Sequence, residues 1–186
     1  MSNHRAASRY AKSILELALE QKKLKEVHAD FQKLTEVAES NYEFGVILKN
    51  PIINSDKKQA ILKSLFEKDA QKLTMSFFDI ISRKNREDIL LDVAREFEIQ
   101  YNIHSSIQVA DLTTTFPIDE KLRKEFVDVV KSISGLKEVK LVEKVDPEII
   151  GGFILRVNDR LLDDSISSKL RELRNQFSTN HFEKSI

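Results

Sequence analysis

Residues 90–115, LLDVAREFEIQYNIHSSIQVADLTTT, contain the transition that decides the fold. In the first half, Leu90, Val93 and Phe97 recur at the three- and four-residue spacing of one helix face. In the second half, the short apolar run from Ile107 to Leu112 is followed by three threonines, a pattern typical of a strand. The change of hydrophobic period predicts a helical domain before this point and a mixed domain after it.

Toward the N-terminus, helical spacing is repeated through the first hundred residues, where Gly45 and Pro51 are the only glycine and proline. We expect six helices with short connections, which form an antiparallel bundle over residues 1–105. The expected helices run over residues 4–21, 24–38, 41–48, from 55 onward, 70–83 and 87–102, with Ser55 as the N-cap of the fourth. The apolar residues of the fifth helix, which are expected to point inward, are Leu73, Phe77, Ile80 and Ile81.

Toward the C-terminus, residues 106–186 combine strand and helix signals in a smaller domain. Asp119 is expected to cap a helix that ends at Gly135, and Ser165 to cap a last helix. Three further strands are expected, around residues 139–145, 153–157 and 160–162. The last helix carries an apolar stripe that consists of Ile166, Leu170, Leu173 and Phe177. The predicted fold class is therefore mainly α, with an N-terminal six-helix bundle followed by a smaller α+β C-terminal domain.

The composition excludes several functional classes. The 186 residues carry 30 basic and 30 acidic side chains, so the chain lacks the basic excess that nucleic-acid binders use for phosphate contacts. No cysteine is present, which rules out disulfides, thiolate zinc sites and a cysteine nucleophile. No stretch approaches the ~20 apolar residues of a membrane helix, and the N-terminus has no apolar signal core. We therefore expect a cytoplasmic protein. It could lie at a membrane surface but not within the membrane.

No catalytic, cofactor-binding or metal-binding constellation is recognisable in the sequence. The four histidines lack the i, i+4 pairing of a helical metal site. The pair Gly151-Gly152 is not followed by the Gly-Lys-Ser/Thr of a phosphate loop, and is expected to mark close backbone packing or a bulge at a strand start. We therefore expect no enzymatic activity, no cofactor and no metal.

The first helix carries a group of small residues, among them Ala7 and Ala11, on either side of Tyr10. Small side chains allow another helix to approach closely. That helix belongs either to a partner protein or to the bundle itself, and the spacing alone favours neither alternative.

Three stretches carry a resemblance to a known family, and they cover nearly the whole chain. The first is ASRYAKSILELA at residues 7–18, and the second is LKNPII at residues 48–53, followed by Lys57-Lys58 and Ile61-Leu62. The third and most specific is VDPEIIGGFILRV at residues 145–157, followed by an aspartate two residues before a serine, Asp163 and Ser165. In this order and spacing they resemble the delta subunit of F-type ATP synthases, called the oligomycin-sensitivity-conferring protein in mitochondria. The family's small residue between that aspartate and serine is here Asp164.

The resemblance implies a non-catalytic stator subunit that links the catalytic alpha/beta head to the peripheral b stalk, so that proton-driven rotation is coupled to ATP synthesis. In this family the N-terminal domain binds the N-terminal helix of an alpha subunit in a groove between the first and fifth helices. The candidate groove residues here are Ala7, Tyr10, Ala11, Ile14, Phe77 and Ile81. The C-terminal domain binds the b subunits, and its signature residues are Asp146, Pro147, Gly151, Gly152, Asp163 and Ser165. The implied location is peripheral, on the cytoplasmic face of the inner (plasma) membrane, with contact to the membrane only through the complex.

Two other classes of protein remain as alternatives. An RNA-binding or translation-associated protein would need a basic face that only folding could assemble. A small hydrolase or transferase would need a pocket in which polar side chains converge. The surface charge and the pockets of the folded chain discriminate between these classes.

Overall fold

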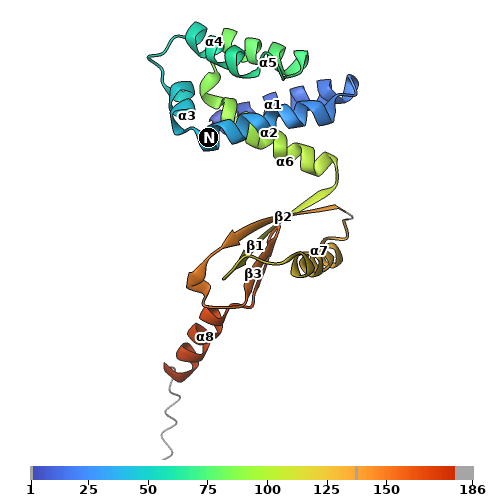
Figure 1. The fold of residues 1–186 in the computed structure, drawn as a ribbon, viewed down its shortest axis with the longest axis vertical. Coiled ribbons are helices and arrows are strands. Elements are labelled where there is room, and N and C mark those ends of the chain that lie inside the picture. The colour runs from blue at the N-terminus through green and yellow to red at the C-terminus, as the bar shows by residue number, and fades with distance from the viewer. Residues whose placement is uncertain (1, 137, 179–186) are drawn as a thin grey trace, which may run out of the picture. The chain divides into compact units, whose positions relative to one another are not determined.

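The computed structural model describes residues 2–136 and 138–178, and it divides into two compact units. The first unit ends at His104 and the second begins at Ser105. Each unit has a hydrophobic core of its own. Figure 1 shows the first unit as a group of helices and the second as a small sheet accompanied by helices.

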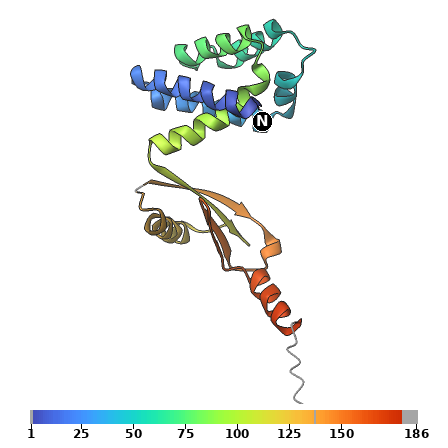
Figure 2. The ribbon, with the colours of Figure 1, turned by 180° about the vertical axis from the view of Figure 1, so that it is seen from behind.

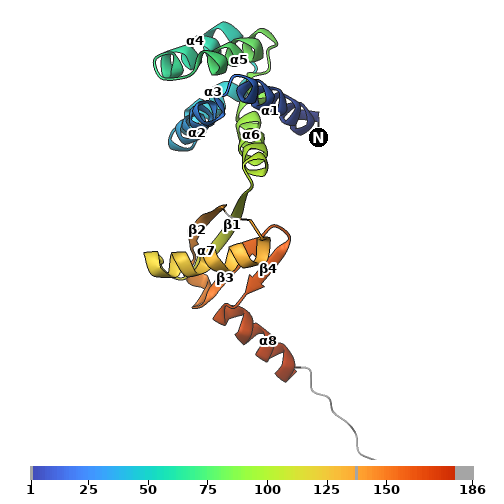
Figure 3. The ribbon, with the colours of Figure 1, turned by 90° about the vertical axis from the view of Figure 1, so that its right-hand side faces the viewer.

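Over residues 2–104 the structure contains the six expected helices. They are α1 (Ser2–Glu20), α2 (Leu24–Ser40), α3 (Tyr42–Lys49), α4 (Ser55–Phe66), α5 (Lys72–Arg83) and α6 (Leu90–His104), the last preceded by a 3-10 turn, η1 (Glu87–Ile89). Within this unit α6 packs against both α1 and α2, while α4 and α5 pair with each other. Figure 3 shows α4 and α5 on one side of α1 and α2, and α6 on the other side.

Phenylalanine side chains from four helices form the centre of this first core. Phe31 of α2 stacks on Phe97 of α6 with ring centroids 4.6 Å apart, and meets Phe77 of α5 edge-on at 6.0 Å. Phe66 of α4 meets Phe78 of α5 at 5.6 Å. Aromatic pairs of this kind contribute about 0.5–1.5 kcal/mol each beyond the burial of their area. The cluster therefore fixes α2, α4, α5 and α6 to one another.

A buried carboxylate joins α2 to the start of α5. Asp30 accepts hydrogen bonds from the backbone amide of Gln71 at 2.9 Å and from the hydroxyl of Thr74 at 2.5 Å. The first amides of a helix have no partner inside the helix. Asp30 therefore caps α5 from a position 41 residues earlier in the chain.

Two expectations for the first unit are wrong. Ser55 is the first residue of α4 and not its N-cap, since its hydroxyl donates to the side-chain oxygen of Asn85 at 2.6 Å. Ile80 does not point inward, because its side chain is 50% exposed. Helical spacing placed Ile80 beside Phe77 and Ile81, but it lies at the edge of the buried stripe.

The second unit is a four-stranded sheet with one helix on one face. Its elements are β1 (Ile107–Thr114), α7 (Glu120–Ser134), β2 (Glu138–Val145), a 3-10 turn η2 (Pro147–Ile149), β3 (Phe153–Val157), β4 (Arg160–Asp163) and α8 (Ile166–Ser178). The strand order is β2-β1-β3-β4; β1 and β2 are parallel, and the other pairs are antiparallel. Figures 1 and 2 show α7 against the sheet from opposite directions. Between them lies a small core of Ala110, Leu112, Val130, Leu155 and Val157.

The expected caps of this unit are confirmed. The Asp119 carboxylate accepts from the Leu122 amide at 2.9 Å, and α7 ends at Gly135 with a left-handed φ of 72°. The Ser165 hydroxyl accepts from the Ser168 amide at 3.2 Å at the start of α8. The predicted fold class, a helical bundle followed by a smaller α+β domain, is likewise confirmed.

Candidate partner-binding surfaces

The surface between α1 and α5 is defined by contacts at its two ends. At one end the rings of Tyr10 and Phe77 meet edge-on with centroids 6.2 Å apart. At the other end the Lys23 ammonium, just beyond α1, donates to the Gln71 side chain, just before α5, at 3.1 Å. The two helices therefore run antiparallel. The guanidinium of Arg86 lies 5.9 Å from the centre of the Tyr10 ring and donates to the Tyr10 hydroxyl at 3.4 Å.

The burial of the six candidate groove residues divides them into two groups. Tyr10 is partly exposed. The other five are almost fully buried: Ala7, Ala11 and Ile81 at 0%, Ile14 at 1% and Phe77 at 6% exposed. In the free chain these five side chains belong to the bundle core and lie beneath the surface between α1 and α5.

The accessible apolar atoms on this surface come from residues that were not among the six groove candidates. Leu17 is 44% exposed and lies seven residues after Tyr10, on the same side of α1. On α5, the half-exposed Ile80 and the partly buried Leu73 flank Phe77 at three and four residues. Spacings of three, four and seven residues from Tyr10 and Phe77, which mark one helix face, are the signal that could have identified them.

The small residues of α1 pack inside the bundle. Ala7 and Ala11 belong to the buried core, and α1 makes its most extensive packing in this unit with α6. The Gln100 side chain of α6 donates to the backbone oxygen of Ser8 at 3.1 Å, which requires a close approach of the two helices. Of the two alternatives for these small residues, the structure therefore shows packing within the bundle.

The second candidate surface is built on the segment from Asp146 to Gly152. The Asp146 carboxylate accepts from the Glu148 amide at 3.0 Å, while its own amide donates to the Thr114 oxygen at 2.8 Å. Pro147 occupies the first turn of η2, where its missing amide hydrogen has no cost. This arrangement holds the end of β2 beside the end of β1.

The glycine pair lies where the start of β3 passes the start of α8. Gly152 has a φ of 77°, and a Cβ at this position would lie 2.3 Å from the backbone oxygen of Asp164. A Cβ on Gly151 would lie 2.6 Å from the side chain of Ile166, whose amide donates to the Gly151 oxygen at 3.0 Å. The expectation that the pair marks close backbone packing is confirmed.

Asp163 and Ser165 join the end of β4 to the start of α8. The Asp163 carboxylate accepts from the Ser168 hydroxyl at 2.6 Å and from the Ser165 amide at 2.9 Å. These hydrogen bonds hold the pKa of Asp163 below its usual value. The bond from the Ser168 hydroxyl has the largest effect, followed by those from the hydroxyl and the amide of Ser165. Ser165 itself is 1% exposed, whereas Pro147, Gly152 and Asp163 are exposed. The contacts of Asp163 and Ser165 fix the position of α8.

The signature residues position α8, and one face of this helix is apolar and uncovered. The stripe expected on the last helix is present on α8, and it is exposed: Ile166 by 44%, Leu170 by 52%, Leu173 by 47% and Phe177 by 78%. Figure 1 shows α8 extending away from the sheet. An amphipathic helix with an open apolar face of this kind is typical of a protein–protein contact.

Membrane-spanning helices and metal-binding clusters were the other features sought among the described residues. None of the helices they form is both long and apolar enough to cross a membrane. Residues 2–136 and 138–178 contain no group of three or more histidine, aspartate or glutamate side chains placed to hold a metal ion. His28 stacks on Tyr101 with centroids 3.7 Å apart, and its Nε2 lies 2.5 Å from the Glu98 carboxylate, so it is part of the α2–α6 packing.

Comparison with known proteins identifies the family. The family model described as ATP synthase delta (OSCP) subunit matches residues 6–177. ATP synthase subunit delta of Cytophaga hutchinsonii is 37% identical over 178 residues, which is 96% of this chain and 97% of that protein. ATP synthase subunit delta of Amoebophilus asiaticus is 39% identical over 177 residues, which is 95% of this chain and 96% of that protein.

A solved structure shares the fold. A chain of the Toxoplasma gondii mitochondrial ATP synthase hexamer superimposes with a TM-score of 0.73 over 94% of this chain and 98% of that chain, at 19% identity. The family match and the two relatives extend over both units and over every signature residue discussed above. The chain therefore belongs to the ATP synthase delta (OSCP) subunit family, a family of non-catalytic subunits of that complex.

Proposed function

We propose that this chain is a stator link in an F-type ATP synthase, joining the catalytic alpha/beta head to the peripheral b stalk. The observation that carries the proposal is that each unit has its own core and its own exposed apolar helix surface. A two-ended clamp needs this arrangement, because each end must remain folded while it holds a different partner. Membership of the delta family supports the same reading.

The surface between α1 and α5 is the proposed site for the N-terminal helix of an alpha subunit. Leu17 and Ile80 supply exposed apolar atoms from its two sides, and Tyr10, which lies beside Arg86, is partly accessible. An amphipathic helix laid along this surface would cover these side chains. Ala7, Ala11, Ile14, Phe77 and Ile81 then support the site from below, as the core on which the contact residues stand.

The apolar face of α8 is the proposed site for the b stalk. Four large side chains along one stripe give a partner helix a continuous apolar contact. Asp146, Pro147, Gly151, Gly152, Asp163 and Ser165 contribute by fixing the start of that helix against η2 and β3.

Tight binding at both ends is sufficient for this role. Rotation of the central stalk exerts torque on the head, and a link that resists the torque couples proton flow to ATP synthesis without any chemistry of its own. In this proposal the chain is a peripheral subunit on the cytoplasmic face of the membrane, which it reaches only through the complex.

Two pairs of variants test the two surfaces separately. Leu17→Ser combined with Ile80→Ser should weaken binding of a peptide from the alpha N-terminus about tenfold or more, with unchanged binding to a C-terminal b fragment. Leu170→Ser combined with Leu173→Ser should weaken binding of the b fragment to a similar extent and leave binding of the alpha peptide unchanged. All four residues are about half exposed, so the fold should persist.

The matched controls are Lys12→Ser on α1 and Arg171→Ser on α8, both exposed and both away from the apolar stripes. Isothermal titration calorimetry on each variant provides the measurement. The assignment of the two surfaces is wrong if each double variant weakens the other partner, or if the controls weaken binding as much as the double variants do.

A further inference from the structure

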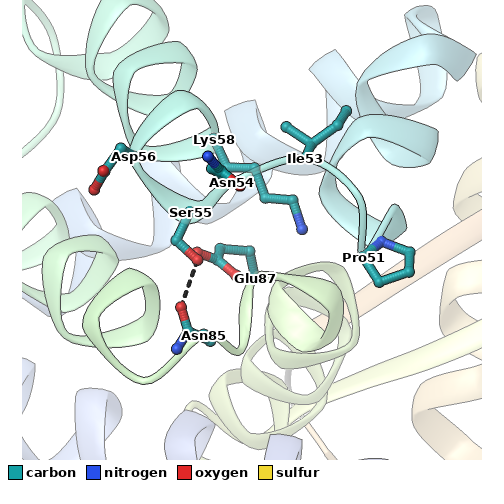
Figure 4. Close-up of a pocket in the computed structure, with 8 residues that line it drawn as sticks. All are labelled: Pro51, Ile53, Asn54, Ser55, Asp56, Lys58, Asn85 and Glu87. Carbon is teal, nitrogen blue, oxygen red and sulfur yellow. Dashed lines mark hydrogen bonds between the residues drawn. The ribbon is translucent and has the colours of Figure 1, made fainter.

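A pocket in the first unit lies where two distant stretches of the chain meet. The connection from α3 to α4 and the first turn of α4 form one side, and the turn between α5 and η1 forms the other. Its volume is about 520 Å³. The side chains that line it are those of Pro51, Ile53, Asn54, Ser55, Asp56, Lys58, Asn85 and Glu87, as Figure 4 shows.

Glu87 presents a buried acceptor to this pocket. The residue is 2% exposed, and its Oε1 is buried without a hydrogen-bond partner. Figure 4 shows its side chain pointing toward Ser55 at the start of α4. Buried polar atoms of folded proteins almost always have a partner, and a buried carboxylate without one is unfavourable. The position of Glu87 in the first turn of η1 does not supply the missing donor.

Two side chains of the lining donate to other acceptors. The Ser55 hydroxyl donates to the Asn85 side-chain oxygen at 2.6 Å. The Lys58 ammonium, itself 5% exposed, donates to the backbone oxygen of Leu48 at 2.9 Å. The exposed Asp56 adds a second carboxylate, so the lining contains two acidic residues and one basic residue.

We propose that this pocket binds a guanidinium or primary ammonium group. Such a cation brings several N–H donors and can supply the hydrogen-bond partner that is missing at Glu87 Oε1. Its positive charge balances the excess of acidic residues in the lining. The pocket is much larger than the roughly 30 Å³ share of one water molecule, so it has room for a side-chain head group. The group comes either from a basic side chain of a neighbouring subunit or from a free amine; the chemistry of recognition is the same.

Titrations of the full chain, followed by amide NMR, test the chemistry. Agmatine, which carries both a guanidinium and an ammonium group, should shift the amide signals of Ser55, Asn85 and Glu87 in a saturable way. Tetramethylammonium has the charge without N–H donors, and should leave these signals in place. The proposal is overturned if agmatine produces no saturable shift at these amides, or if inorganic phosphate saturates the same amides in its place.

Two variants locate the effect. Glu87→Gln removes the buried charge at constant shape and should weaken agmatine binding at least tenfold. Asp56→Asn removes the exposed charge and should weaken binding about twofold at low salt and less at high salt, because exposed charges are screened. Equal agmatine affinity in wild type and Glu87→Gln would overturn the role of Glu87. If Glu87→Gln does not fold, the comparison of the three probes on wild type decides the question alone.

A second measurement identifies the source of the cation, and it rests on the proposed function. The chain is titrated onto ATP synthase heads that have been depleted of this subunit. A basic side chain of the head is the source if Glu87→Gln binds the heads at least tenfold more weakly and agmatine competes with wild type. A free amine is the source if both proteins bind the heads equally while only wild type binds agmatine. Failure of wild type to bind the heads contradicts the proposed function, whereas the agmatine titration still decides the pocket.

Discussion

The backbone of Gly152 touches that of Asp164 so closely that a Cβ on Gly152 would lie 2.3 Å from the Asp164 carbonyl oxygen. Hydrogen bonds on either side hold the contact in place, from the Asp164 amide to the Phe153 oxygen and from the Ile166 amide to the Gly151 oxygen, both at 3.0 Å. The start of β3 and the start of α8 are thus joined through backbone atoms. Any side chain at residue 152 must separate them.

The first prediction separates steric overlap from backbone strain at Gly152. Gly152→Ala should destabilise the second unit by more than about 2 kcal/mol, because a left-handed φ and the overlap with Asp164 both oppose the side chain. Gly135→Ala is the matched control, since Gly135 has a φ of 72° with nothing within 4 Å of a Cβ. It should cost only about 1 kcal/mol. Thermal unfolding followed by circular dichroism gives both values; equal losses would show that the close approach contributes nothing.

The second prediction concerns coupling and rests on the proposed function. Gly152→Val should detach the second unit from the b stalk while the first unit, which has a separate core, still binds the alpha peptide. ATP hydrolysis by the head should persist and proton-driven synthesis in membrane vesicles should fall. A variant that lost hydrolysis by the head and kept coupled synthesis would refute the stator role.

The third prediction concerns acid stability. Because hydrogen bonds hold the pKa of Asp163 below its usual value, this carboxylate stabilises the second unit at pH values above about 4. That contribution is lost as the pH falls through the lowered pKa of the folded state. Ser168→Ala removes the principal hydrogen bond, and should raise the pKa of Asp163 and reduce the loss of stability below pH 4. Carboxyl-carbon NMR titration measures the shift, with Ser167→Ala as the control; an unchanged pKa in Ser168→Ala would show that Ser168 is not its cause.

The fourth prediction concerns the cap that α2 supplies to α5. Asp30→Ala leaves the Gln71 amide and the buried Thr74 hydroxyl without their acceptor, and should cost about 1–3 kcal/mol. Hydrogen exchange at Gln71 should accelerate, whereas exchange in α1 should change only as far as global stability does. Asp69→Ala removes the exposed partner of Lys33 nearby and should have no measurable effect on stability. Equal effects of the two substitutions would show that burial of Asp30 is unimportant.

The elements that the sequence predicted well are those whose ends carry a local signal. Asp119, Gly135 and Ser165 each act on amides or dihedral angles within a few residues, so their roles follow from neighbouring sequence. Ser55 carried the same local signal, but its hydroxyl bonds to Asn85, thirty residues later. The Ser55 hydroxyl is thus used in a contact with a residue distant in sequence, and the sequence around Ser55 does not reveal that contact.

The candidate site was less predictable because periodicity shows which residues share a face and not what covers the face. Ile80 and Ile81 are adjacent apolar residues on α5, yet one is 50% exposed and the other 0%. Leu170 and Leu173 follow the pattern of a core-facing helix and remain exposed, because in this chain nothing described covers that side of α8. The parallel pairing of β1 with β2 likewise depends on how α7 crosses the sheet, which alternation within each strand does not specify.

The central place of β1 in the sheet has a consequence for how the chain is made. Both neighbours of β1, the strands β2 and β3, are synthesised after it, and the parallel pairing with β2 must wait for the whole of α7. During translation β1 therefore leaves the ribosome with both of its edges unpaired, while the helices before it already have their complete core. Pairings distant in sequence also close slowly. The nascent protein thus passes through a stage in which the complete bundle carries one unpaired strand, whose open edges can pair with another chain.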